Sequence, residues 1–306
     1  MEEMQLKTIM QCVPNYSEGR NLDIVNKIAE CFKGKEGVRL LDYSSDEDHN
    51  RSVFTIIGEP EKLRDAVIAS CEVALNSIDL RKHKGQHPRM GAVDVIPFIP
   101  IKNCSIKDAD DIAKQVGKYL GEVLNQPVYL YEKSATNAAR ENLADIRRGE
   151  FEGLFEKMQK PGWEPDFGPL SPKPTGGATA VGARMPLIAF NVNLATDNLQ
   201  IAKEIAKNVR NSNGGFRYIK AMGVMLEERK IAQVSMNVTD YTKTSLYRVF
   251  ETIKMEAQRY GVGVVGSELI GLAPMQAFID SAQYYLRLEN FSPKQVLENR
   301  LLEVDE

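Results

Sequence analysis

Histidine is scarce in this chain, with 3 among 306 residues. Because histidine is the side chain whose charge changes near neutrality, few positions can supply acid–base chemistry at pH 7. Long hydrophobic runs are absent too, since no stretch reaches the roughly 18 consecutive apolar residues of a membrane-spanning helix. The first ten residues, MEEMQLKTIM, lack the basic start and apolar run of a signal peptide. We therefore expect a cytoplasmic protein without a membrane partner.

An excess of charge of one sign is also missing. The 39 basic and 42 acidic residues give a formal net charge of -3 and an isoelectric point near 5.8. Proteins that bind nucleic acids usually carry a broad positive field, so no nucleic-acid partner is expected. The four cysteines lie far apart without a C-x-x-C pair, which argues against a zinc or redox site. We expect no metal site, and reduced thiols at Cys12, Cys31, Cys71 and Cys104.

Short apolar runs alternate with helical periodicity along the whole chain, and each half approximates the order β-α-β-β-α-β. This order predicts an α+β fold, an α/β sandwich of two subdomains with related topology and mixed sheets with helices packed on their outer faces. We place the subdomains at residues 1–178 and 179–306. Strands are expected at 38–42, 52–58, 92–101, 128–131, 187–194, 216–226, 231–238 and 262–265, and helices at 22–33, 199–209 and 243–260 and from residues 60, 105 and 274.

The segment 161–177 holds five of the 14 prolines and the only tryptophan. Such a run cannot form a regular helix or a central strand, so an extended, semi-rigid connection is expected. One interpretation is a plain linker. The other is that exposed backbone N–H groups, the aromatic residues Trp163 and Phe167, and the pair Gly176-Gly177 line a ligand cleft between the subdomains.

Two patterns suggest functions that the context disfavours. Residues 261–266 spell G-x-G-x-x-G, but they follow an amphipathic helical pattern rather than a strand, so Gly261 is expected to cap a helix and not to bind a dinucleotide. The acidic run 46–49 reads as a solvated loop, because four consecutive side chains rarely converge on one metal ion. Arg51 directly afterwards could hold a substrate carboxylate or form a surface salt bridge.

His87 is the most informative histidine. It follows His83 by four residues and lies in a loop bracketed by Gly85 and Gly91, directly before a predicted strand. Catalytic groups often sit on such loops, and a histidine with an ordinary pKa of about 6.5 can both accept and donate a proton near neutrality. The alternative is a structural histidine bonded to its own loop. No G-x-S-x-G or similar context supports a nucleophilic triad.

Several stretches together resemble one family, glutamate formiminotransferase, also called glutamate formimidoyltransferase. The likeness covers nearly the whole chain, and the block His87-Pro-Arg-Met-Gly91 is its most specific part. The matching stretches are Cys12-Val-Pro-Asn-Tyr-Ser-Glu-Gly-Arg-Asn21, Asn50-Arg-Ser-Val-Phe-Thr-Ile-Ile-Gly-Glu-Pro60, Gly85-Gln-His-Pro-Arg-Met-Gly-Ala-Val-Asp94, Pro165-Asp-Phe-Gly-Pro169 and Gly177-Ala-Thr-Ala-Val-Gly-Ala-Arg184.

The resemblance implies a homodimer that transfers a formimino group from N-formimino-L-glutamate to N5 of tetrahydrofolate, a late step of histidine degradation. It also implies that His87 is the essential histidine and that a substrate tunnel lies between the two subdomains. Tetrahydrofolate would be a co-substrate rather than a bound cofactor. The residues that the resemblance places against folate are Gly168, Pro169, Leu170, Ser171, Pro172, Lys173, Pro174, Thr175, Gly176 and Gly177.

A single histidine suits this chemistry, because one imidazole can remove a proton from the attacking nitrogen and return one to the leaving nitrogen. Arg51, Arg89 and Arg184 are our hypothesised clamps for substrate carboxylates. Animal members of the family often continue into a cyclodeaminase domain, and here we expect transferase activity alone. The sequence leaves two other hypotheses open, a related folate enzyme with a formyl donor and a non-catalytic folate-binding protein. It assigns no role to His49 or His83.

Overall fold

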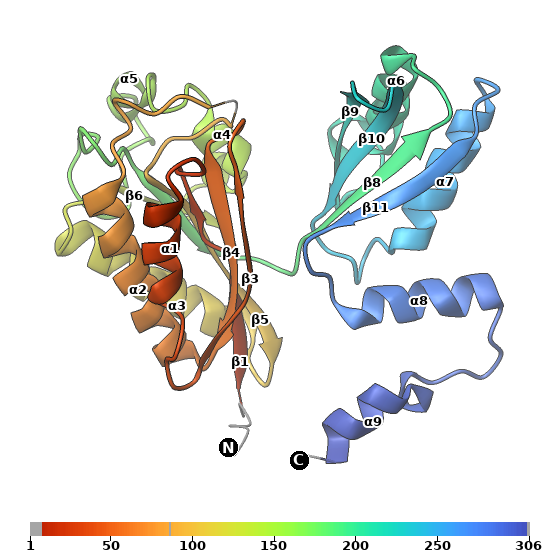
Figure 1. Cartoon of the computed structure of the whole chain (residues 1–306), viewed down its shortest axis with the longest axis horizontal. Helices are drawn as coiled ribbons and strands as arrows, with labels where there is room; N and C mark the ends of the chain where they lie inside the picture. The colour runs from red at the N-terminus through yellow and green to blue at the C-terminus, as the bar shows by residue number, and fades with distance from the viewer. Residues whose placement is uncertain (1–7, 86, 305–306) are drawn as a thin grey trace. The chain divides into compact units, whose positions relative to one another are not determined.

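The computed structural model describes residues 8–85 and 87–304, and the chain divides into two compact units, Met1–Arg184 and Met185–Glu306. Figure 1 shows the elements of both units. Gln86, which belongs to the matching stretch around His87, lies outside the described residues. Within the part of the chain that is described, no helix is both long and apolar enough to cross a membrane.

The first unit is built on a seven-stranded mixed sheet. From one edge the strands run β3, β4, then the consecutive short strands β1 and β2, then β5, β7 and β6. The pairs of β7 with β5 and with β6 are parallel, and the others are antiparallel. The strands are β1 Ile9–Cys12, β2 Asn15–Tyr16, β3 Val38–Asp46, β4 Arg51–Gly58, β5 Val93–Lys102, β6 Val128–Glu132 and β7 Thr179–Ala183.

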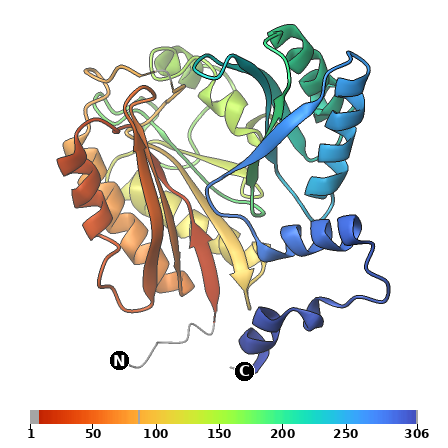
Figure 2. The same ribbon diagram turned by 45° about the vertical axis from the view of Figure 1, so that its right-hand side comes forward.

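Three helices cover one face of this sheet, as Figure 2 shows for the elements coloured red to yellow. Alternate residues of each strand point to the two faces of the sheet. In β4, Ser52, Phe54 and Ile56 are buried, whereas Arg51 and Val53 on the other face are only half-buried. The opposite face of β5, β6 and β7 packs a smaller apolar cluster with two short helices. The helices are α1 Leu22–Glu30, α2 Pro60–Ser77, α3 Ile106–Glu122, the turn η1 Ala138–Arg140, α4 Leu143–Arg147 and α5 Leu154–Met158.

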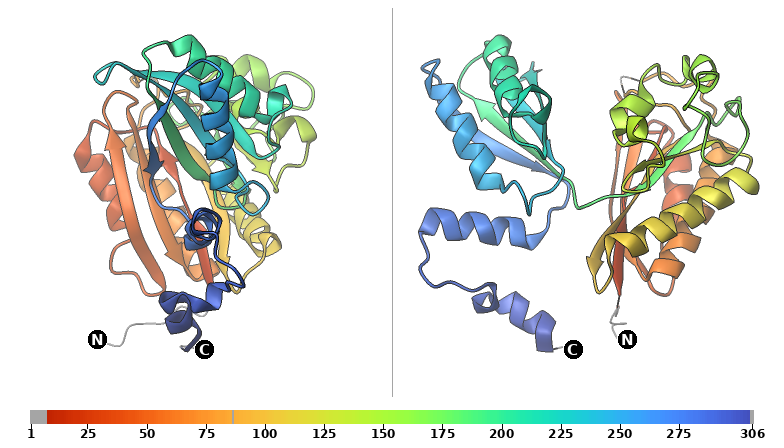
Figure 3. Two further views of the ribbon diagram at one scale, coloured as in Figure 1. Left: turned by 90° about the vertical axis from the view of Figure 1, so that its right-hand side faces the viewer. Right: turned by 180° about the vertical axis from the view of Figure 1, so that it is seen from behind.

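The second unit has a four-stranded sheet in the order β11-β8-β10-β9, antiparallel throughout. Helices α6 and α7 pack against the apolar side of this sheet, as Figure 3 shows. The elements are β8 Ile188–Leu194, α6 Leu199–Val209, η2 Asn211–Asn213, β9 Ile219–Leu226, β10 Ile231–Val238, α7 Leu246–Gln258, β11 Val264–Ile270, α8 Met275–Leu286, η3 Pro293–Gln295 and α9 Leu297–Val304.

The predicted repeat of β-α-β-β-α-β is confirmed. The second unit follows it from β8 to β11, and the first follows it from the β1–β2 pair through β5, with corresponding strands as neighbours. The mixed sheet that we predicted for both units occurs in the first unit only, because the parallel strands β6 and β7 are additions that the second unit does not share. Gly261 follows α7 with a φ of 66°, as expected for a helix cap.

The division of the chain falls after Arg184, whereas we expected it after residue 178. The reason is β7, which lies between β5 and β6 and so belongs to the first sheet. As a result, the proline-rich residues 161–177 lie inside the first unit, between α5 and β7.

Candidate functional site

The loop from His83 to Ala92 is tied to neighbouring segments by side chains of its own. The Nε2–H of His83 donates to the carbonyl of Asn50 at 2.8 Å, and its Nδ1 accepts from Nε of Arg89 at 3.2 Å. The side-chain amide of Asn50 donates to the carbonyl of Lys84 at 3.1 Å and accepts from the backbone N–H of Gly19 at 2.9 Å. His83 therefore anchors the loop, a role that the sequence left unassigned.

The two glycines that bracket the loop permit close backbone approach. A Cβ on Gly85 would lie 2.3 Å from the carbonyl oxygen of His49, and one on Gly91 would lie 2.0 Å from that of Ala178. Gly91 forms an isolated bridge with Gly177, whose φ is 62°. Only glycine fits such positions without moving the backbone, so this loop is held against both the β3–β4 turn and the start of β7.

His87 lies between a carboxylate and a guanidinium. Its Nε2 is 3.6 Å from Oδ2 of Asp94, and its Nδ1 is 3.5 Å from Nη1 of Arg51. Asp94 is fully buried, and it accepts hydrogen bonds from the backbone N–H of Met90 at 2.8 Å and from Nη2 of Arg147. His87 itself is 8% exposed. The side chains come from β4, β5, α4 and the loop, on the side of the sheet away from α2 and α3.

Burial, more than the surrounding charges, keeps the imidazole of His87 neutral at pH 7. Burial lowers the pKa of His87, Arg51 and Arg147 lower it further, and Asp94 opposes them. Burial would raise the pKa of Asp94, but Arg147, His87 and the N–H of Met90 together lower it to about 2. The site thus holds a neutral proton acceptor next to a permanent negative charge.

Positive charge exceeds negative charge close to the imidazole. Burial and the like charge of Arg147 lower the pKa of Arg51. The guanidinium groups of Arg51 and Arg147 share one buried carboxylate, that of Asp94. Arg184 lies beside Tyr131, whose pKa burial raises to about 12, so that this hydroxyl stays a neutral donor. An anionic group would be attracted to this surface.

Arg89 has a different environment from the other two predicted clamps. Its guanidinium pairs with Oε2 of Glu150 at 2.9 Å and with both carboxylate oxygens of Glu152 at 2.9 and 2.7 Å. Its carbonyl accepts from the N–H of Phe151 at 2.9 Å. These contacts tie the His87 loop to residues 149–152, across a cavity of about 540 Å³.

The predicted folate segment, 168–177, is fixed at both ends. Phe167 pairs with Val128 of β6 and fills the room left by Gly117 and Gly121 on α3. Further along, Nζ of Lys173 donates to the carbonyl of Leu124, and Nε2 of Gln126 donates to the carbonyl of Gly176. Gly176 and Gly177 are buried against the loop at 90–92, whereas Gly168, Leu170 and Ser171 are exposed. The exposed part is accessible to a ligand, and its buried end adjoins the His87 loop.

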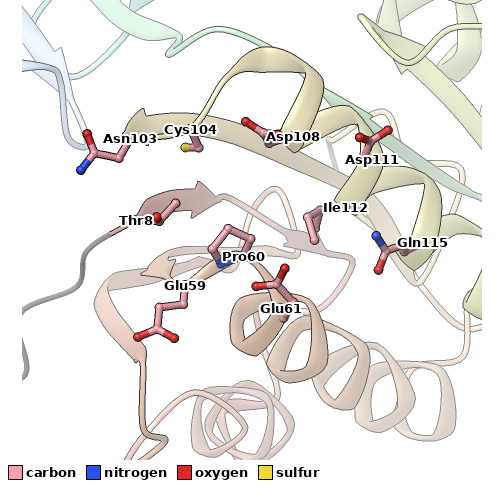
Figure 4. Close-up of a pocket in the computed structure, with 10 residues that line it drawn as sticks. All are labelled: Thr8, Glu59, Pro60, Glu61, Asn103, Cys104, Asp108, Asp111, Ile112 and Gln115. Carbon is pink, nitrogen blue, oxygen red and sulfur yellow. The ribbon is translucent and has the colours of Figure 1, made fainter.

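A larger cavity in the first unit lies elsewhere. It has a volume of about 720 Å³ and is found where β5 ends and α2 and α3 begin, as Figure 4 shows. Four acidic residues line it, Glu59, Glu61, Asp108 and Asp111. Asp94 lies at the opposite end of β5, so this cavity contains none of the predicted site residues. Its negative charge would repel an anionic substrate.

Two members of the site were not predicted from the sequence. Asp94 ends the matching stretch around His87, but nothing in the local pattern indicates that it faces the histidine. Arg147 is 53 residues from Asp94 in sequence and lies in a five-residue helix without any motif. Within the described residues, no group of three or more histidine, cysteine, aspartate or glutamate side chains could hold a metal ion.

The fold and the site define a class of protein, a pair of α+β units of which the first carries a buried, neutral histidine in a positively charged setting. Comparison with known families makes this specific. Residues 9–184 match the N-terminal subdomain of the formiminotransferase domain, and residues 189–303 match the formiminotransferase domain. The chain belongs to the formiminotransferase family.

Named relatives agree with this assignment. The chain is 54% identical to a glutamate formimidoyltransferase of Streptococcus pyogenes serotype M1, over 96% of this chain and 99% of that one. It is 43% identical to a glutamate formimidoyltransferase of Thermoplasma acidophilum, over 96% of this chain and 97% of that one. A formimidoyltransferase-cyclodeaminase of Rattus norvegicus is 42% identical over 92% of this chain, but only 53% of that protein is covered.

Proposed function

We propose that this protein is a glutamate formimidoyltransferase, which transfers the formimino group of N-formimino-L-glutamate to N5 of tetrahydrofolate. The products are 5-formiminotetrahydrofolate and L-glutamate. The observation that carries the proposal is the neutral, buried imidazole of His87 within a cluster of arginines, in a chain whose full-length relatives are named for this activity.

His87 serves as base and then as acid in this reaction. Attack of N5 on the amidine carbon gives a tetrahedral intermediate, in which N5 must lose a proton and the departing glutamate nitrogen must gain one. A single imidazole placed between the two nitrogens carries that proton from one to the other, so the reaction needs no covalent enzyme intermediate. A positioned acid–base group of this kind accelerates reactions about 10²- to 10⁴-fold.

The arginines divide into two roles. Arg51, beside His87, and Arg184, beside Tyr131, bind substrate carboxylates, because a guanidinium matches a carboxylate with two parallel hydrogen bonds. Arg89 holds the loop, since its donors already meet Glu150 and Glu152. Residues 168–177 contact folate through their exposed part, and their buried end adjoins the loop of His87.

The test compares wild type with His87→Ala, following tetrahydrofolate-dependent loss of formiminoglutamate and measuring folate binding alongside. His49→Ala is the matched control, because His49 is exposed and pairs with Asp46 on the surface. We expect His87→Ala to bind folate and to lose at least about a hundredfold in turnover, and His49→Ala to keep it. Normal turnover by His87→Ala would contradict the role of the histidine.

The same assay separates the two other hypotheses. A formyl donor that outcompetes formiminoglutamate would indicate the related folate enzyme, and tight folate binding without transfer from either donor would indicate a binding protein. A cytoplasmic homodimer is part of our proposal, carried by the family resemblance. Light scattering coupled to size-exclusion chromatography tests the dimer.

A further inference from the structure

The contacts of the two ring nitrogens of His87 determine where its proton resides. A guanidinium offers only donors, so Nδ1, which faces Nη1 of Arg51 at 3.5 Å, must present its lone pair. The proton of the neutral ring then resides on Nε2, which faces the carboxylate of Asp94 at 3.6 Å. The opposite tautomer would place N–H against the guanidinium and a lone pair against the carboxylate, two repulsive contacts in a buried site.

Asp94 is held in place by groups that do not touch His87. Its Oδ1 accepts from the N–H of Met90, and its Oδ2 accepts from Nη2 of Arg147. The carboxylate is fully buried in β5, so Arg147 supplies the charge that offsets its desolvation. Both contacts to the imidazole are long, 3.5 and 3.6 Å. They orient the ring, but they are weak enough for Arg51 to move away and leave the lone pair of Nδ1 accessible.

We propose that Asp94, fixed by Arg147, is a positioning residue that keeps neutral His87 protonated on Nε2, so that Nδ1 is the nitrogen that moves the proton. A substrate carboxylate that binds Arg51 draws the guanidinium from Nδ1 and exposes the lone pair. Nδ1 then takes the proton of N5, the imidazolium is stabilised by Asp94, and Nδ1 returns the same proton to the glutamate nitrogen. The last step rests on the proposed function, whereas the tautomer does not.

Nitrogen-15 NMR tests the tautomer without any reference to activity. With 3 histidines in the chain, the spectrum of protein labelled at histidine is assigned from His87→Ala and His49→Ala. Above neutral pH we expect His87 of wild type to carry its proton on Nε2. In Asp94→Asn the oxygen stays on the N–H of Met90 and an NH₂ group faces Nε2, so a proton on Nε2 loses its acceptor. The share of the ring protonated on Nδ1 then rises, although Arg51 still opposes it. A proton on Nδ1 in wild type, or no change in the variant, overturns the proposal.

Steady-state kinetics test the consequence for catalysis. We expect Asp94→Asn to lower kcat about 10²- to 10⁴-fold with little change in KM, as the corresponding aspartate-to-asparagine change does in serine proteases by imposing the wrong tautomer. Removal of the negative charge also lowers the pKa of His87, so the acid limb of kcat/KM moves to lower pH. Loss of activity with an unmoved acid limb and an unchanged tautomer would indicate a merely structural role.

Arg147 provides a second route if Asp94→Asn does not fold. Arg147→Lys keeps the positive charge next to Asp94 and should retain the Nε2–H tautomer, whereas Arg147→Gln should lose it together with kcat. Equal behaviour of the two variants overturns the proposal. Failure of the proposed function would be recognised separately, because wild type would then transfer nothing while its tautomer was still as predicted.

Discussion

Replacement of Arg51 should change substrate binding and the pH profile at the same time. Its Nη1 lies 3.5 Å from Nδ1 of His87, and its side chain is half-buried. A hydrogen bond between charged groups stabilises a complex by about 1.5–3 kcal/mol, and 1.36 kcal/mol corresponds to a factor of ten. Arg51→Ala should therefore raise KM for formiminoglutamate about 10- to 150-fold.

The pH effect follows from the sign of the charge. Neutral His87 is the active base, so activity falls as pH drops through its pKa, which burial and the two arginines place below the ordinary value of about 6.5. Removing the charge of Arg51 removes a repulsion from the imidazolium. The pKa of His87 then rises, and the acid limb of kcat/KM moves to higher pH.

Arg51→Lys separates the two effects, because lysine keeps the charge and loses the planar fork. KM should rise in this variant while the acid limb stays near its wild-type position. The assay is the initial rate of tetrahydrofolate-dependent loss of formiminoglutamate over a pH series. The reasoning is refuted if Arg51→Ala changes KM by less than about threefold, or if its acid limb moves to lower pH.

Three further changes probe the frame around the site. Gly91→Ala, whose Cβ would meet the carbonyl of Ala178 at 2.0 Å, should lower the free energy of unfolding by about 3 kcal/mol in urea titrations, and an unchanged midpoint would contradict the close approach. Asn50 has a φ of 49° and two side-chain hydrogen bonds, so Asn50→Ala should lower the free energy of unfolding by about 3 kcal/mol. Asn50→Gly should lower it measurably less, because glycine tolerates that φ. Equal losses in the two variants would refute backbone strain at this position. A double-mutant cycle of Arg89→Ala and Glu152→Ala should give a coupling free energy of about 1 kcal/mol in unfolding, because the ion pair is bidentate but Glu152 is exposed. A coupling of zero would show that the pair does not hold the loop.

The order of elements was predictable because periodicity reports burial. In β4 and α2 the apolar residues recur at the spacing of a strand and a helix, and Ser105 forms a capping box with Asp108 where a helix was expected to begin. The parallel pairing of β6 and β7 was not predictable, since partner strands are chosen by contacts between distant residues. For the same reason, residues 161–177 resembled a connection between units, although they lie within the first unit between α5 and β7.

The candidate site was predictable only where the chemistry is local. His87 could be singled out because glycines and a proline surround it in the sequence. Asp94 and Arg147 could not, because their roles depend on a contact across 53 residues of chain. Arg89 shows the converse: its position beside His87 suggested a substrate clamp, but which carboxylates reach it depends on where residues 150 and 152 fold.

The most direct test of the central claim is chemical rescue of His87→Ala with free imidazole, in the assay of transfer from formiminoglutamate to tetrahydrofolate. If His87 moves the proton, wild type transfers the group, the variant loses at least about a hundredfold, and added imidazole restores part of the lost rate in its neutral form. If wild type transfers nothing, or the variant turns over normally without imidazole, the account of this histidine is contradicted.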